Sequence, residues 1–224
     1  MPKTVEKDFG SFSGVPLLWD RDRGARDHMD MDKSLFARAS GDGFRLLRIY
    51  RFAGNSVTVG RTFRGDLPEE WQKTDPEVAV RPTGGGAVWH RGDLCFSFFS
   101  SPRPPVTLKE FYRLFHGWLN RFLETRTIQA SCLGPDRPSP SRSGKGLCFS
   151  DPVPGDLLVG DRKVLGGALR ISGRHILYQG SLLISGLSPE ILAESFVEWY
   201  EKEGSRILME EIFPVRGLKI RCPV

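Results

Sequence analysis

The stretch Val78-Ala-Val-Arg-Pro-Thr-Gly-Gly-Gly-Ala-Val-Trp-His90, followed closely by Asp93-Leu-Cys-Phe-Ser-Phe-Phe99, decides the fold and carries most of the functional information in the chain. Between two segments of strand character lie three consecutive glycines, Gly84, Gly85 and Gly86. Glycines let a ligand approach the backbone and tolerate positive φ. Arg81 enters this loop and His90 leaves it, which suits an anionic or carbonyl-bearing ligand held by backbone N–H groups. A glycine-rich hairpin without a ligand explains the pattern equally well.

The segments around this glycine loop alternate between strand and helix character. Strands are predicted at Phe44–Tyr50, Ser56–Gly60, Glu77–Val80, Ala87–His90, Leu94–Ser100 and His175–Ile184. A short helix is predicted over Met29–Ala39, and the capping box Thr107-Leu-Lys-Glu110 starts a longer one that ends near Glu124. Ser188-Pro-Glu predicts the N-cap and first residues of a last helix. This mixed order predicts an α+β fold, a mixed β-sheet flanked by helices.

The bulk composition indicates one globular domain over residues 1–224. The chain is 39% hydrophobic and 26% charged, with a net charge of +5 and no run of five like charges, so no nucleic-acid partner is expected. The four cysteines form no C-x-x-C pair, which argues against a metal site or a disulfide framework. No segment resembles a signal peptide or reaches the ~18 apolar residues of a membrane span, so a cytoplasmic protein is expected.

Lys163 and Cys148 are the candidate catalytic residues. Lys163 follows the hairpin turn Gly160-Asp161, and Gly166-Gly167 is expected to interrupt the strand on which it lies. A lysine above such glycines can stabilise an oxyanion or act as a base, although a solvated strand lysine is the simpler interpretation. Cys148 follows residues 135–145, a polar Pro/Ser-rich segment predicted to be a mobile loop, either a lid or a connector. A nearby lysine could activate its thiol, but cysteines are often only buried packing residues.

The remaining histidines and cysteines give weaker signals. His116 falls off the apolar stripe of its predicted helix, so it is expected to be solvated, and His28 has no distinctive context. Cys95 lies within an apolar strand and is interpreted as a core residue. None of these residues is a candidate for chemistry from its pattern alone.

Five segments taken together resemble the biotin/lipoate A/B protein ligase family. The glycine loop is similar to its Arg-Arg-x-x-Gly-Gly-Gly-x-Val-x-His signature, and Asp161-Arg-Lys-Val-Leu-Gly-Gly-Ala-Leu-Arg170 to its Gly-x-Lys-(Ile/Val)-x-Gly-x-Ala-x-Arg motif. Tyr178-Gln-Gly-Ser-Leu-Leu183 resembles the His-Gly-(Ser/Thr)-Leu-Leu strand, with Gln179 in place of histidine. Met29-Asp-Met-Asp32 and Val57-Thr-Val-Gly-Arg61 match the N-terminal helix and strand, so the resemblance covers roughly residues 28–190.

The resemblance implies a fold like the catalytic domain of class II tRNA synthetases. It also implies attachment of an octanoyl or lipoyl group to a lysine of a carrier domain. Lys163 then corresponds to the family lysine that contacts the acyl carbonyl. The implied substrate-binding residues are Arg81, Gly84, Gly85, Gly86, His90, Gly166, Gly167 and Gly180, with His90 at the pocket edge.

Two subclasses of this family remain open. Octanoyltransferases take the acyl group from acyl carrier protein through a cysteine thioester and need no cofactor, whereas ligases use ATP and Mg, in some cases with an accessory domain. Cys148-Phe-Ser-Asp-Pro152 is similar to the nucleophilic segment of the Gram-positive type of octanoyltransferase, which favours transfer onto lipoyl-carrier domains, GcvH-like or dehydrogenase subunits. The third glycine, Gly86, is more typical of the ligases, and Cys148 would then be a bystander. A non-catalytic acyl- or biotin-binding module is the third interpretation.

Overall fold

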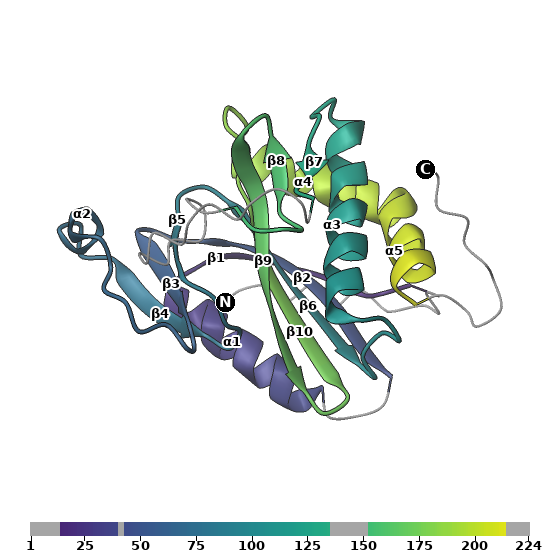
Figure 1. The fold of residues 1–224 in the computed structure, drawn as a ribbon, viewed down its shortest axis with the longest axis horizontal. Helices are drawn as coiled ribbons and strands as arrows, with labels where there is room; N and C mark the ends of the chain where they lie inside the picture. The colour runs from purple at the N-terminus through teal and green to yellow at the C-terminus, as the bar shows by residue number, and fades with distance from the viewer. Residues whose placement is uncertain (1–13, 40–42, 135–151, 214–224) are drawn as a thin grey trace, which may run out of the picture.

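A computed structural model describes residues 14–39, 43–134 and 152–213, which form two mixed β-sheets with helices packed on them (Figure 1). The larger sheet has the order β1-β2-β6-β10-β9-β8-β7 and the smaller one β4-β3-β5. The bounds are β1 Leu17–Arg23, β2 Phe44–Phe52, β3 Ser56–Gly60, β4 Glu77–Arg81, β5 Ala87–His90, β6 Leu94–Ser101, β7 Ser131–Cys132, β8 Leu157–Val159, β9 Arg162–Ser172 and β10 His175–Leu182. The pairs β1–β2 and β3–β4 are parallel, and the other strand pairs are antiparallel.

One face of the larger sheet carries the main hydrophobic core. Helices α3 (Leu108–Thr125), α4 (Pro189–Trp199) and α5 (Ser205–Ile212) cover this face, with a π-helical turn, η1 (Tyr200–Gly204), between the last two. Phe96 and Phe98 of β6 point into this core, because alternate residues of a strand face the same side. The predicted capping box is present at Thr107 and Glu110, and it fixes where α3 begins.

Helix α1 (Ala25–Arg38) packs on the opposite face of the larger sheet and also contacts β4 of the smaller one. Its Met29 joins Tyr50 and Cys95 in a second, smaller apolar cluster. Beside that cluster, the buried carboxylate of Asp32 pairs with the guanidinium of Arg48 at 2.6 Å. A buried ion pair is costly unless its remaining atoms are also hydrogen-bonded. The other hydrogen bonds that Asp32 accepts are therefore needed to stabilise this ion pair.

Most of the predicted elements are confirmed, but two expectations are wrong and some elements were missed. Strand β9 runs without a break through Gly166 and Gly167, which were expected to interrupt it. His116 is fully buried rather than solvated. Strand β1 was not predicted, and neither was the short helix α2 (Glu69–Gln72) at the tip of the smaller sheet. The predicted loop at residues 135–145 lies outside the described residues.

No helix among the described residues has the length and apolar character needed to cross a membrane.

Candidate active site

A cavity of about 560 Å³ opens between the two sheets, on the face of the larger sheet that also carries α1. Its walls combine the glycine loop, the middle of β9 and β10, and apolar side chains from α1, β2 and β5. The apolar lining includes Met29, Tyr50, Phe52, Phe63, Val88 and Val153. Of the sequence-predicted site residues, it is lined by Arg81, Gly85, Gly86, His90, Lys163, Gly166, Gly167 and Gly180. A cavity whose exposed lining is predominantly apolar, with polar side chains at some positions, suits an acyl chain that ends in a carbonyl.

Arg81 shapes the glycine loop. Its guanidinium donates two hydrogen bonds to the carbonyl of Gly84, at 3.1 and 2.8 Å, and one to the carbonyl of Thr58 at 3.3 Å. Gly84 is not among the cavity-lining residues, so its contribution is this carbonyl. Gly85 has φ +94°, a backbone conformation that residues other than glycine disfavour. The loop therefore has a shape that requires glycine at position 85, and Arg81 holds it through the carbonyl of Gly84.

Gln179 connects the same loop to the buried ion pair beneath α1. Its amide oxygen accepts a hydrogen bond from the hydroxyl of Thr83 at 2.7 Å, and its amide nitrogen donates to the carboxylate of Asp32 at 2.6 Å. Arg48 and Asp32 thus anchor the glycine loop through one side chain. Gln179 is uncharged, and it forms this bridge at the position where the family resemblance leads one to expect histidine.

Lys163 lies in the cavity wall beside Asp156. Its ammonium is 2.8 Å from the carboxylate, and the two side chains are only 5% and 2% exposed. The same carboxylate oxygen accepts the backbone N–H of Val153 at 2.8 Å. Burial raises the pKa of Asp156, and the Lys163 ammonium together with the Val153 N–H opposes that rise. The interpretation of Lys163 as a solvated strand lysine is therefore wrong.

The glycines of β9 and β10 make room for side chains as well as for a ligand. A Cβ atom on Gly166 would overlap the end of Lys163, and one on Gly167 or Gly180 would overlap the ring of Tyr178. The hydroxyl of Tyr178 lies 2.7 Å from Nε2 of His116, whose Nδ1 lies 2.6 Å from the carbonyl of Gly155. Burial lowers the pKa of His116 to about 4, so the ring is neutral at pH 7.

His90 belongs to a buried polar cluster at the cavity wall rather than to a free edge. Its Nδ1 lies 2.7 Å from the carboxylate of Asp93, and its Nε2 lies 2.9 Å from the hydroxyl of Thr58. Asp93 also accepts hydrogen bonds from the thiol of Cys95 and the hydroxyl of Ser181. Burial opposes ionisation of Asp93, but His90 and these donors outweigh it and lower its pKa. Both nitrogens of His90 are engaged, so its structural role here is to hold the wall.

Cys95 is buried, as predicted, but it also lines this cavity. Burial and the neighbouring Asp93 charge raise its pKa well above the usual value, which keeps the thiol protonated and unreactive. Among the described residues, His90, Asp93 and Cys95 are the three whose nitrogen, oxygen and sulfur atoms could hold a metal ion. The His90 ring nitrogen Nδ1 and the Cys95 thiol are already hydrogen-bonded to the carboxylate of Asp93. Cys148 lies outside the described residues.

Sequence reasoning missed the roles of Asp156, Gln179 and Asp93. The signal for Asp156 was present, because a tight turn at Gly160-Asp161 brings the residues before β8 alongside β9. Asp93 lies three residues after His90 and could have been paired with it across the turn. The two contacts of Gln179 join residues 96 and 147 positions away, so no local pattern indicates them.

Comparisons with known proteins identify the family of the chain. The lipoyl protein ligase A/B catalytic domain matches residues 24–207. An octanoyltransferase LipM of Carboxydothermus hydrogenoformans is 28% identical over 184 residues, which cover 79% of this chain and 63% of that protein. The LipM of Staphylococcus aureus is 26% identical over 204 residues, covering 86% of this chain and 73% of its own length. This chain spans 63% and 64% of the relatives from C. hydrogenoformans and Kyrpidia tusciae, slightly less than two thirds.

Solved structures show the same fold at low identity. A lipoate-protein ligase A bound with ATP superposes with a TM-score of 0.65 at 20% identity, over 89% of this chain and 94% of that one. A bipartite lipoate protein ligase from Thermoplasma acidophilum gives a TM-score of 0.62 at 18% identity, over 89% and 92% of the two chains. The fold inferred from the sequence motifs is thereby confirmed. The chain belongs to the lipoyl protein ligase A/B catalytic-domain family.

Proposed function

We propose that this protein transfers an octanoyl group from a carrier thioester to the lysine of a lipoyl-carrier domain. The observation that carries the proposal is the buried Lys163 in the wall of an apolar cavity beside the glycine loop. This arrangement offers a charged donor for an acyl carbonyl and apolar walls for its tail. The relatives named octanoyltransferase LipM support transfer over ligation.

The cavity supplies affinity without polar recognition of the chain. Burial contributes about 0.8 kcal/mol per CH₂, so an octanoyl tail gains on the order of 5 kcal/mol when it leaves water. The carbonyl end then lies near Lys163, where the ammonium stabilises the charge that develops on the carbonyl oxygen. The backbone of Gly85 and Gly86 lines the same cavity and lets the ligand approach closely.

Cys148 is the proposed nucleophile. In the sequence it lies five residues before Val153, which lines the cavity. The Cys148 thiolate attacks the thioester carbon, a new C–S bond forms, and the donor thiol leaves and takes up a proton.

The second half-reaction releases the enzyme. The uncharged amine of the carrier-domain lysine attacks the acyl-enzyme, an amide bond forms, and the Cys148 thiolate is expelled while the nitrogen loses a proton. Neither step consumes ATP, so no nucleotide or Mg is required. Acidic acyl carrier protein and lipoyl-carrier domains are the proposed partners, with Arg137, Arg142 and Lys145 contributing charge; such an encounter should weaken as salt increases.

A reconstituted transfer assay tests the proposal. Octanoyl–acyl carrier protein and an apo lipoyl-carrier domain are mixed with the enzyme, with and without ATP and Mg, and the carrier domain is weighed by mass spectrometry. We expect one octanoyl group per carrier domain in both mixtures and none with Lys163→Ala. Modification that needs free lipoate or octanoate together with ATP and Mg would show that the chain is a ligase instead. Octanoate binding without any modification would show a non-catalytic binding module.

A further inference from the structure

We propose that Asp156 is a positioning residue that holds the ammonium of Lys163 at the place where the acyl carbonyl must lie; this inference rests on the proposed transferase function. Asp156 contacts the Lys163 ammonium. Lys163 is one of the residues that line the cavity, whereas Asp156 is not. The acid would therefore act on a substrate only through the lysine.

The carboxylate of Asp156 is itself held rigidly. One oxygen receives both the Lys163 ammonium and the Val153 N–H, each at 2.8 Å. The backbone around it is tied to the loop after β7: the N–H of Leu133 donates to the carbonyl of Asp156 at 2.8 Å, and the N–H of Gly155 donates to the carbonyl of Leu133 at 2.9 Å. The acceptor of the ion pair is therefore fixed by main-chain contacts on both sides.

A second set of contacts ties the same loop to α3 and β10. Nδ1 of His116 lies 2.6 Å from the carbonyl of Gly155, so it must carry the proton and donate it. Nε2 is then the acceptor for the hydroxyl of Tyr178 at 2.7 Å. These two hydrogen bonds connect Tyr178 of β10, through His116, to Gly155, the residue before Asp156. The backbone next to Asp156 is therefore held in place relative to the sheet that carries the cavity.

Lysine needs such a partner because its side chain is long and flexible. Four rotatable bonds let the ammonium sample many positions, and ordering them costs entropy. A displacement of about 1 Å at a catalytic group can cost on the order of 10²-fold in rate. Gly166 leaves the space in which the lysine lies, and Asp156 defines the position of its end within that space.

Burial also argues for a role beyond stability. Two charges that are 5% and 2% exposed have lost most of their hydration. A buried ion pair is often no more stabilising than apolar residues of the same volume. An acid and a lysine at this depth, with the lysine opening onto the cavity, are thus better explained by the need for a fixed charge at the wall.

The test is a set of variants assayed for octanoyl transfer with saturating carrier domain. We expect Asp156→Asn, which keeps the shape and removes the charge, to lower kcat by about 10²-fold. The KM for the acyl donor should change by less than about threefold, because the apolar cavity that binds the tail is intact. Asp156→Glu keeps the charge on a longer stem and should recover part of kcat.

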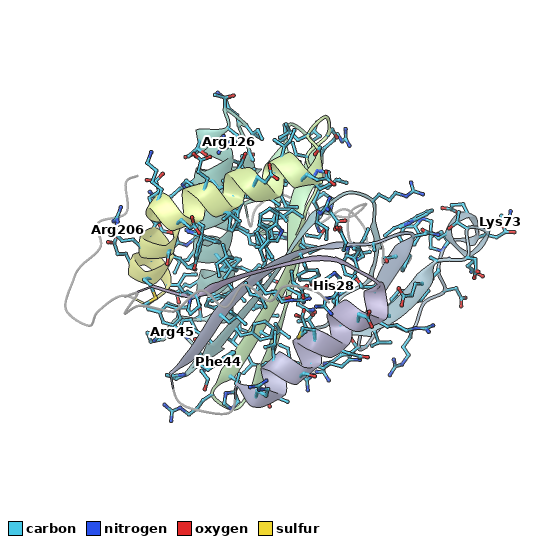
Figure 2. The ribbon with its side chains drawn as sticks, turned by 180° about the vertical axis from the view of Figure 1, so that it is seen from behind. His28, Phe44, Arg45, Lys73, Arg126 and Arg206 are labelled. Atoms are coloured by element: carbon cyan, nitrogen blue, oxygen red, sulfur yellow. The ribbon has the colours of Figure 1, made fainter. Side chains whose placement is uncertain are left out.

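Two controls separate positioning from folding. Asp75→Asn removes the same charge at an exposed site, in the segment after α2 that follows Lys73 at the tip of the smaller sheet (Figure 2). Asp75 has a positive φ, which asparagine also tolerates. Leu208→Ala destabilises the core under α5, on the face of the larger sheet opposite the cavity, and should keep kcat below its unfolding temperature. A wild-type kcat in Asp156→Asn, or an equal loss of kcat in Leu208→Ala, would overturn the proposal.

A stability measurement keeps the pairing testable if no transfer is found. Urea midpoints are compared for Asp156→Asn, Lys163→Met and the double variant. Removing one partner leaves a buried charge unpaired, so the double variant should recover part of the midpoint that each single variant loses. Non-additive midpoints without transfer activity would refute the transferase function and keep the pair. Additive midpoints would refute the pairing itself, whatever the activity.

Discussion

Replacing Gly166 by alanine tests whether catalysis depends on the exact position of the Lys163 ammonium. A Cβ atom built on Gly166 lies 2.3 Å from Cε and 2.6 Å from Nζ of Lys163. Ordinary van der Waals contact starts at 3.4 Å, so the end of the lysine must shift by about 1 Å. A shift of about 1 Å at a catalytic group costs on the order of 10²-fold in rate, which corresponds to about 2.7 kcal/mol of transition-state stabilisation.

The same substitution should leave the protein folded. The atoms that must move are at the flexible end of a side chain, while the backbone of β9 keeps an ordinary strand conformation. The free energy of unfolding should therefore fall by no more than about 1–3 kcal/mol, the usual range for slight overpacking. We expect a large loss of rate together with a folded protein.

Octanoyl transfer rates and urea unfolding curves of the same preparations provide the assay. Gly117→Ala is the matched control, because a Cβ there meets no atom within 4 Å and the residue lies inside α3. Alanine should stabilise that helix by up to about 1 kcal/mol and leave transfer unchanged. If Gly166→Ala transferred octanoate within about twofold of the wild-type rate, the requirement for a fixed ammonium would be refuted.

Three further predictions concern the network around the cavity. Burial holds the pKa of His116 near 4, below the 6.5 expected when unfolded, so stability is greatest above pH 6.5 and falls by up to about 3 kcal/mol as the pH drops towards 4. Urea unfolding at several pH values should show this slope, and His116→Gln should reduce it. Gln179→Leu should cost about 1–3 kcal/mol by leaving Thr83 and Asp32 short of a partner; an unchanged urea midpoint would contradict the bridge. Arg81→Lys should raise the KM of the acyl donor, because lysine cannot reproduce the two bonds to Gly84; an unaltered KM would show that the loop needs no such support.

Local patterns predicted the parts of the fold that local physics controls. The capping box of α3, the N-cap Ser188 of α4 and the turn at Gly160-Asp161 were all visible in the sequence. Strand β1 was missed because it contains charged residues that usually mark a loop. The structure places Asp20 of this strand 2.9 Å from the buried Arg48, so a tertiary ion pair compensates for the polar sequence.

His28 and His116 show the same limit for buried polar residues. The position of His28 on α1, beside the larger sheet, can be followed in Figure 2, and its Nε2 lies 2.7 Å from the carbonyl of Arg51, a contact that its sequence context did not indicate. The partners of His116 are a backbone carbonyl and a tyrosine hydroxyl from distant segments. The helical pattern assigned His116 to solvent because such a pattern contains no information on hydrogen bonds that only the fold supplies.

The candidate site divides in a similar way. The order of the motifs identified Lys163, Arg81 and the glycine loop, and the structure brings these residues together around one cavity. Only the structure shows that Gly166 leaves room for the side chain of Lys163, and that Gly167 and Gly180 leave room for the ring of Tyr178. In the sequence, a glycine that makes room for a ligand cannot be distinguished from one that makes room for a neighbouring side chain.

The measurement that tests the central claim most directly is the intact mass of the enzyme after mixing with octanoyl–acyl carrier protein in the absence of ATP. The account predicts an added mass of one octanoyl group that hydroxylamine removes, that Cys148→Ala abolishes, and that Lys163→Ala forms far more slowly. An enzyme that transfers octanoate without this adduct, or whose Cys148→Ala variant transfers at the wild-type rate, would contradict the thioester mechanism.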